Sequence, residues 1–383
     1  MRRAELVMWA AVLALLLSAP LFLGAYNLSL LSRFLAMGIL AMGISLVWGD
    51  AGILPLGQGL FFGLGAYAVA MHLKLSALGP GEIPDFMQWD GLTALPWLWV
   101  PFKSGAFSLL AALVIPAAVA GALGWLLFHR RVGGVYFAII TQALVLAGTT
   151  FIVSQQPYTG GFNGLTDFRT FFGIVLTSQR VQTNLYFVIV AILALCYAGM
   201  RWLLRTHFGK LLRAIRDGEN RVRFLGYDPA PFKVAAFAIG AAMAGIAGVL
   251  FTLNIGVISP AMIGVMPSIE MVVWVAVGGR ESLVGAVLGT LLVNFGKDQV
   301  SSAFPQAWLF VMGGLFILVV TAMPEGLGGL FALLERRPRS EARTTMVITK
   351  IVASIDDREQ AAGGHSRKDA SGKASHARSK EAG

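Results

Sequence analysis

Long apolar runs alternate with short polar segments along most of this chain. The runs cover residues 6–24, 34–48, 49–70, 107–128, 135–153, 185–204, 232–253, 270–278, 284–295 and 308–323. Their length and composition predict membrane-spanning helices, although the runs near residues 50 and 285 are short. A signal peptide is the competing interpretation of the first run. We expect an all-α, polytopic transmembrane helical bundle of about 10 spans (8–10) over residues 1–337.

Small residues within two of these runs predict close helix packing. Four glycines lie between residues 57 and 65, and Gly240, Ala244 and Gly248 follow one another at intervals of four. Such spacing lets the backbones of two helices approach each other closely. The connections 75–103, 154–183 and 255–268 are expected outside the membrane on one side.

The segment 205–228 interrupts the apolar pattern and is too polar to lie in lipid. Its apolar residues recur at near-helical spacing, at Leu211, Ile215, Val222 and Leu225. Asp217–Gly218 predicts a turn in the middle, and Gly226 predicts a helix stop. We predict a helix-turn-helix at the cytoplasmic face, with an apolar ridge that packs against something outside the bilayer.

Basic residues lie mostly on one side of the predicted bundle. Alternating the spans places these sites together: Arg2, Arg3, Arg130, Arg131, the segment 205–228, Arg280, Arg336 and Arg337. The positive-inside rule then puts this side, and both termini, in the cytoplasm. Residues 338–383 are polar and basic, which predicts a disordered cytoplasmic tail.

Composition excludes several classes of function. With 56% hydrophobic and 13% charged residues, the chain is not a soluble protein. Its net charge of +10 does not indicate nucleic acid binding, because the basic residues form no single aromatic-laced patch. The lone Cys196 excludes an intrachain disulfide. No phosphate-binding loop, nucleophile elbow or histidine cluster occurs, so we expect no catalytic residue, metal site or cofactor.

Polar side chains within or beside the spans are candidates for a solute pathway, because such groups tend to face a bundle interior or water. The candidates are Gln58, Gln142, Thr149, Asn163 and Glu270. Gln142 and Thr149 are seven residues apart and share a helix face. An interhelical hydrogen bond is an equally good interpretation of Gln142. Glu270 sits at a predicted span end, where facing the external water is the better interpretation.

The basic segment resembles the coupling loop of ABC-transporter permeases of the branched-chain amino-acid/urea class. The matching residues are Gly209, Arg213, Ala214, Ile215, Arg216, Asp217, Glu219 and Gly226. In that family the loop docks into a cleft on the ATP-binding subunit, which implies the same role for these residues. The resemblance extends from about residue 40 to residue 331.

Two further motifs, VYFAIITQAL from Val135 and QQPYTGGFNGLTDF from Gln155, resemble the urea-type branch. Urea is flat and neutral, and suits uncharged acceptors such as Gln and Thr, whereas an amino-acid zwitterion favours a charged partner or helix terminus. The resemblance implies a bacterial inner-membrane importer. Its implied partners are a homologous second permease, two ATP-binding cassette subunits and a periplasmic solute-binding protein, with ATP used only by partners.

Two alternatives remain open at this point. The first is an ABC permease for branched-chain amino acids or short amides, since a permease of this class takes what its binding protein delivers. The second is a stand-alone channel or secondary transporter for a small polar solute, which needs no ridged basic loop and favours a buried coupling carboxylate.

Overall fold

The computed structural model describes residues 3–79, 81–166, 168, 170–171, 174–175, 178–304, 308–322 and 326–327. Its helices are α1 (Arg3–Phe22), α2 (Ala25–Ile44), α3 (Gln58–Ser76), α4 (Asp85–Trp89), α5 (Gly105–His129), α6 (Val135–Ser154), α7 (Gln156–Thr159), α8 (Gln179–Arg205), α9 (His207–Phe224), α10 (Pro229–Ile255), α11 (Val265–Gly278), α12 (Leu283–Ala303) and α13 (Trp308–Ala322). The predicted tail, residues 338–383, lies outside the described residues.

Short elements complete the described chain. A π-helical turn, η1 (Ser45–Asp50), prolongs α2, and the 3-10 turns are η2 (Val100–Lys103), η3 (Gly161–Asn163) and η4 (Pro260–Met262). Two-residue strands, β1 (Thr170–Phe171) and β2 (Ile174–Val175), pair antiparallel with Thr170 opposite Val175. The all-helical prediction is therefore confirmed apart from this small ribbon.

Helices α2, α3 and α10 form the inside of the bundle. In the most apolar part of α2 and η1, 89% of the residues are buried. The corresponding share is 28% in α5 and in α6, which lie at the periphery of the bundle. Small residues bring the inner helices together, because a Cβ on Gly43 of α2 would lie 2.9 Å from the carbonyl oxygen of Gly240. A Cβ on Gly248 would come even closer to the carbonyl oxygen of Phe62 in α3. The predicted small-residue packing of α10 is confirmed.

Within the described part of the chain, seven helices are long and apolar enough to cross a membrane. They are α2 with η1, α3, α5, α6, α8, α10, and α11 with η4. The apolar parts of α1 and α13, Trp9–Phe22 and Phe310–Val319, are shorter. The chain is thus a multi-pass membrane protein. The span count of about 10 stays a prediction.

Helices α3 and α11 both begin inside the bundle, after the stretches 51–57 and 256–264, which are non-helical apart from the 3-10 turn η4. A Cβ on Gly59, in the first turn of α3, would lie 2.7 Å from the carbonyl oxygen of Ile263, so the two N-terminal ends meet. The expectation that residues 255–268 lie outside the bundle is wrong for their second half. Ile263 is fully buried and α11 begins at Val265, because the chain turns back inward after Pro260.

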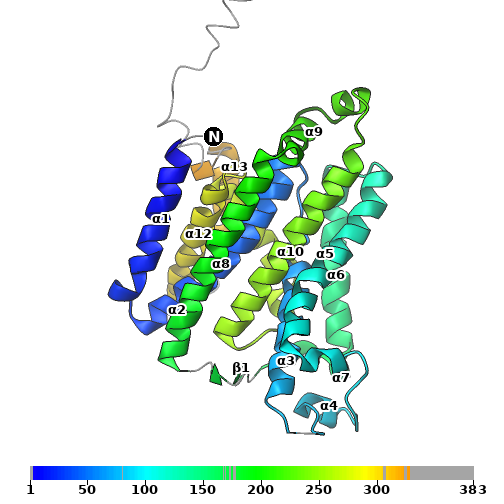
Figure 1. Cartoon of the computed structure of the whole chain (residues 1–383), viewed down its shortest axis with the longest axis vertical. Helices are drawn as coiled ribbons and strands as arrows, with labels where there is room; N and C mark the ends of the chain where they lie inside the picture. Colours follow the sequence, from blue (N-terminus) through cyan, green and yellow to red (C-terminus); the bar gives the residue numbers. More distant parts are fainter. Residues whose placement is uncertain are drawn as a thin grey trace, which may run out of the picture. The chain divides into compact units, whose positions relative to one another are not determined.

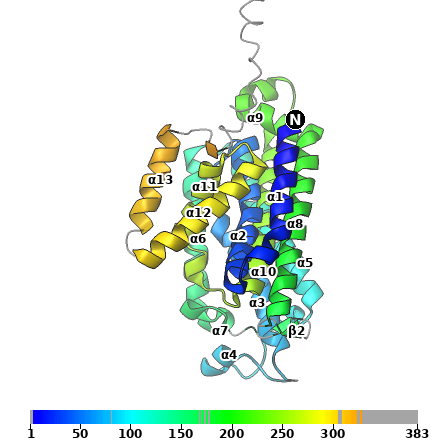
Figure 2. The same ribbon diagram turned by 90° about the vertical axis from the view of Figure 1, so that its left-hand side faces the viewer.

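The two ends of the helix bundle carry different elements (Figure 1). Helix α9 lies at one end, where it contacts α8, α10 and η1. Helices α4 and α7 lie at the opposite end, within the two connections that the sequence places outside the membrane. Figure 2 shows α13 on the opposite side of the bundle from α1 and α8, beside α11 and α12.

Candidate functional site

The basic segment folds as two short helices joined by a kink, as its sequence predicts. Within α9 the backbone leaves helical geometry at Gly218, which has an extended φ of −173° and a ψ of 76°. Gly226 ends the segment with a φ of 88°, a left-handed conformation that glycine tolerates best. Asp228 then caps α10 by accepting a hydrogen bond from the Ala230 N–H at 3.0 Å.

The apolar ridge of this segment is covered by its own chain. Leu211, Ile215 and Val222 form a small buried cluster with Phe232, at the start of α10. The sequence predicted only that the ridge packs against something outside the bilayer, and for these three residues that partner is Phe232 of the same chain. The kink at Gly218 folds the two halves of α9 toward each other and toward α10, which a linear helical spacing does not reveal.

The exposed apolar surface lies at the tip of the segment instead. Phe224 is 92% exposed and Leu225 is 76% exposed, so Leu225 alone of the predicted ridge faces away from the bundle. Ala214 and Asp217, on the first half of α9, are exposed as well. We call Ala214, Asp217, Phe224 and Leu225 the outer face of α9.

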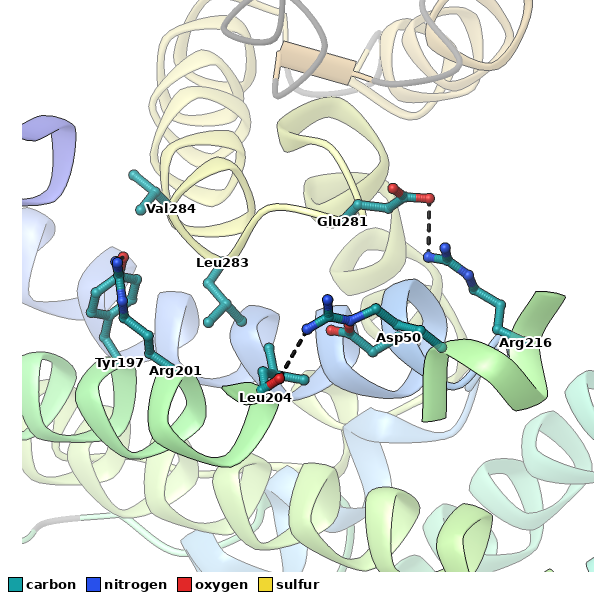
Figure 3. Close-up of a pocket in the computed structure, with 9 residues that line it drawn as sticks. Asp50, Tyr197, Arg201, Leu204, Arg216, Glu281, Leu283 and Val284 are labelled. Carbon is teal, nitrogen blue, oxygen red and sulfur yellow. Dashed lines mark hydrogen bonds and ion pairs between the residues drawn. The ribbon is translucent and has the colours of Figure 1, made fainter. Parts of the chain in front are cut away.

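Two arginines of the first half of α9 bond to the ends of other membrane helices. Arg213 Nε donates to Asp50 Oδ1 at 3.0 Å, and Asp50 is the last residue of η1. Arg216 Nη1 donates to Glu281 Oε1 at 3.1 Å and to the carbonyl oxygen of Gly49. Figure 3 shows the Arg216–Glu281 pair at one side of a pocket and Asp50 near its centre. These bonds attach the first half of α9 to the end of α2 with η1 and to the α11–α12 turn.

The second half of α9 is attached to α10 through Glu219. Its carboxylate accepts hydrogen bonds from Arg223 Nη2 at 2.7 Å and from Lys233 Nζ. Burial works to raise the pKa of Glu219, but the hydrogen bonds from Lys233 and Arg223 outweigh it, so the pKa lies below its ordinary value.

Gly209 has a different position from the other matched residues. It is buried in the corner between α8 and α9, where a Cβ would collide with the backbone of Leu204. The space at residue 209 is therefore needed for the fold of the corner. Ala214, in contrast, is exposed, so we expect its replacement to leave the fold of the corner intact.

Two of the pathway candidates lie where α3, α6 and α11 meet. Gln58 begins α3, is fully buried, and neither of its amide atoms has a hydrogen-bond partner. Gln142 Nε2 donates to the carbonyl oxygen of Val265 at 3.4 Å, while its Oε1 has no partner. Leu56 N donates to Thr141 Oγ1 at 3.3 Å, which joins the approach to α3 to α6. Buried amide atoms without partners are costly, which makes this junction a candidate site for a polar ligand.

The other three candidates do not join this junction. Thr149 donates to the carbonyl oxygens of Val145 and Leu146 within its own helix. Asn163 is exposed in η3, beyond the end of α6. The interpretation of Glu270 as facing external water is wrong, because α11 begins at residue 265 and places Glu270 in its second turn. There it is 7% exposed and accepts a hydrogen bond from Lys297 Nζ of α12 at 2.6 Å.

Sequence reasoning did not identify the partners of these charged residues. Asp50, Lys233, Glu281 and Lys297 each bond to a residue distant in sequence. For Asp50 and Glu281 the sequence did contain a signal: each is an acidic residue at the end of a predicted span, on the same side of the membrane as the basic segment. That position could have indicated an ion pair with an arginine of the segment. Among the described residues, no group of three His, Cys, Asp or Glu side chains is arranged to hold a metal ion.

Comparison with known proteins places this architecture in a family. Residues 26–320 match the model of the branched-chain amino acid transport system permease component. The high-affinity branched-chain amino acid permease protein LivM of Salmonella typhimurium is 27% identical over 83% of this chain and 73% of its own length. The probable permease LivM of Methanocaldococcus jannaschii is 27% identical, covering 76% of this chain and 89% of its own.

A second type of permease protein is similar as well. LivH of Salmonella typhimurium is 26% identical over 76% of this chain and 90% of its own length. No solved structure matches the chain. The multi-pass helical bundle, the family match over residues 26–320 and the similarity to these permease proteins over most of the chain agree: this chain is a member of the ABC-type permease family of branched-chain amino acid transport systems.

Proposed function

We propose that this chain is the transmembrane permease subunit of an ABC importer for branched-chain amino acids, driven by ATP hydrolysis on separate subunits. The match of residues 26–320 to the permease component family carries this proposal. The relatives LivM and LivH are both named for high-affinity branched-chain amino acid transport. This substrate class takes precedence over urea, which the sequence motifs alone favour.

The junction of α3 and α11 supports a substrate with a carboxylate. Neither helix has a side-chain cap at its N-terminus, so backbone N–H groups of both remain available there. Helix N-termini attract anions, and broken membrane helices with meeting N-termini are a recurring way to hold an anionic substrate group. Gln58 and Gln142 add uncharged hydrogen-bonding groups at the same junction. An amino-acid carboxylate matches this combination.

Urea is the second candidate, and one observation favours it. The Oε1 atoms of Gln58 and Gln142 are buried acceptors without partners, and urea carries four N–H donors. A neutral solute leaves the helix N-termini without a charged partner, however, which makes it the weaker match.

The proposed partners follow from the outer face of α9 and from the relatives. Exposed Phe224 and Leu225 lie outside the candidate spans, where a partner protein is needed to cover them. We assign this surface to an ATP-binding cassette subunit. LivM and LivH of one organism carry the same system name, which supports a second, homologous permease beside this chain. A periplasmic solute-binding protein completes the proposed importer.

The proposed topology places α9 in the cytoplasm. With α1, α12 and α13 as three further spans beside the seven, the count reaches ten and both termini lie in the cytoplasm. Arg130, Arg131 and the basic residues of α9 then occupy the side that the positive-inside rule requires.

Uptake by intact cells tests the substrate. Cells that lack this chain are compared with cells that carry it again on a plasmid, using radiolabelled leucine and, separately, radiolabelled urea. We expect leucine uptake to require the chain and to be insensitive to excess unlabelled urea. Loss of urea uptake with unchanged leucine uptake would move the protein to the urea branch.

The energy source separates an ABC importer from a stand-alone carrier. We expect uptake to stop when ATP is depleted and to continue when a protonophore dissipates the proton gradient while ATP is maintained. Uptake that stops with the proton gradient alone would support a secondary transporter, with the buried Glu270 carboxylate, paired with Lys297, as its coupling site.

A further inference from the structure

A buried arginine without a counter-ion lies near the end of α8. Arg201 is 6% exposed, and its Nη1 donates to the Tyr197 hydroxyl at 2.8 Å. Its guanidinium also lies over the Tyr197 ring, 5.9 Å from the centroid, while Nη2 has no partner. Within the described part of the chain, no carboxylate oxygen lies within 4.0 Å of Arg201. A buried cation is costly unless an anion compensates it.

Arg201 lines a pocket of about 180 Å³ between the membrane helices and α9. Figure 3 shows it on one side of the pocket, with Asp50 and the Arg216–Glu281 pair on the other. Both acids in the wall are already engaged, Asp50 by Arg213 and Glu281 by Arg216. Three arginines against two carboxylates leave one positive charge, and it resides at Arg201.

The first turn of α12 forms another wall of the same pocket, through Leu283 and Val284. The first N–H groups of a helix have no partner within it, and they carry a partial positive charge. Ser282 caps one of them by accepting from the Gly285 N–H at 3.0 Å. The pocket thus combines a buried, unpaired guanidinium with the N-terminus of a 21-residue helix, which together favour a phosphate-sized anion.

We propose that this pocket binds a phosphate group, held by Arg201 and the N-terminal turn of α12. The group comes either from the head of an anionic phospholipid or from free phosphate. The apolar side chains of Leu204, Leu283 and Val284 in the wall favour the lipid. Basic pockets between membrane helices are established binding sites for anionic head groups. Because Arg213 and Arg216 share the pocket, its occupant lies directly against α9.

Thermal unfolding of the full-length chain, purified in a neutral detergent, tests this proposal. The melting temperature is measured with phosphatidylglycerol, with phosphatidylcholine and with inorganic phosphate. We expect phosphatidylglycerol to raise it and phosphatidylcholine to leave it unchanged. In Arg201→Gln the apparent affinity for phosphatidylglycerol should fall by about tenfold or more, because a charge-assisted contact is lost. A rise with inorganic phosphate that also requires Arg201 would assign the site to the soluble anion.

Two variants keep the result decisive. Arg130→Gln removes an exposed positive charge after α5 and should respond to phosphatidylglycerol like the unmodified chain. Leu283→Trp fills the pocket without changing its charge and should abolish the rise in melting temperature with phosphatidylglycerol. This variant tests the site even if Arg201→Gln does not fold. Equal stabilisation of all these variants by phosphatidylglycerol, or no stabilisation of the unmodified chain by either phosphate source, would overturn the proposal.

Discussion

Single glycines decide how closely the backbones of this protein approach one another. At Gly209 the α8–α9 corner leaves no room for a Cβ, because the backbone of Leu204 occupies the space. We expect Gly209→Ala to lower the melting temperature of the purified chain, since backbone and not a flexible side chain must shift. Gly199, on α8, has nothing within 4 Å of its Cβ position and provides the matched control. Gly199→Ala should be neutral or slightly stabilising. Equal melting temperatures for both variants would contradict this account of the corner.

The Glu270–Lys297 pair shows how one carboxylate is accommodated within the bundle. Glu270 is buried and Lys297 is partly exposed, with 2.6 Å between Oε2 and Nζ. Removing one partner of a buried pair costs more than removing both, because the remaining charge loses its compensation. We therefore expect Lys297→Met to lower the melting temperature, and Glu270→Gln combined with Lys297→Met to recover part of the loss. A double variant that is less stable than either single one would contradict this interpretation.

At the scale of elements, α9 consists of two halves with separate attachments. The first half bonds to η1 and to the α11–α12 turn, and the second bonds to α10 through Glu219. The sequence predicted the kink at Gly218 from Asp217–Gly218 and the stop at Gly226. It did not predict that Leu211, Ile215 and Val222 pack on Phe232. Apolar residues at helical spacing indicate that a helix face is buried, but they do not indicate which residues cover it.

The attachment of the second half should depend on pH. Folding lowers the pKa of Glu219, so its carboxylate stabilises the fold above the ordinary pKa and loses that contribution as pH falls through the folded value. We expect Glu219→Gln to accelerate amide hydrogen exchange of residues 219–224 at neutral pH. The difference from the unmodified chain should shrink as pH falls below the ordinary pKa of a glutamate and through the lower folded pKa, where the Glu219 carboxylate becomes protonated. A difference that is the same at both pH values would contradict the assigned ion pairs.

The apolar pattern of the sequence did not predict where the discontinuous helices α3 and α11 begin. Their starts were expected near residues 49 and 270, whereas the helices begin at Gln58 and Val265. Pro55 and Pro260 lie in the largely non-helical stretches before them, and such stretches are ordinarily assigned to the outside of a bundle. Here Pro55 and Pro260 are themselves buried, and burial of irregular backbone depends on contacts from other helices that no local pattern contains.

At the scale of the whole molecule, the sequence predicted the order and position of the membrane helices well, because apolar length is a strong local signal. The long-range pairs, such as Asp50 with Arg213, depend on how those helices assemble and have no local signature. The pathway candidates were drawn from polarity alone, so only Gln58 and Gln142 proved to share a junction. Substrate identity is weaker still, since similar uncharged side chains suit both urea and amino acids.

We propose that the outer face of α9 docks an ATP-binding subunit, and copurification tests this docking most directly. The affinity-tagged chain is extracted from its native membranes in mild detergent, as the unmodified protein and as Ala214→Glu. Gln179→Glu, which adds the same charge at the exposed start of α8, is the control, with the membrane level of each variant measured by immunoblot.

We expect an ATP-binding cassette subunit to copurify with the unmodified chain and with Gln179→Glu, and to be lost with Ala214→Glu at an equal membrane level. Undiminished copurification with Ala214→Glu would contradict docking at this face of α9. Absence of such a subunit from the unmodified chain would contradict the importer itself.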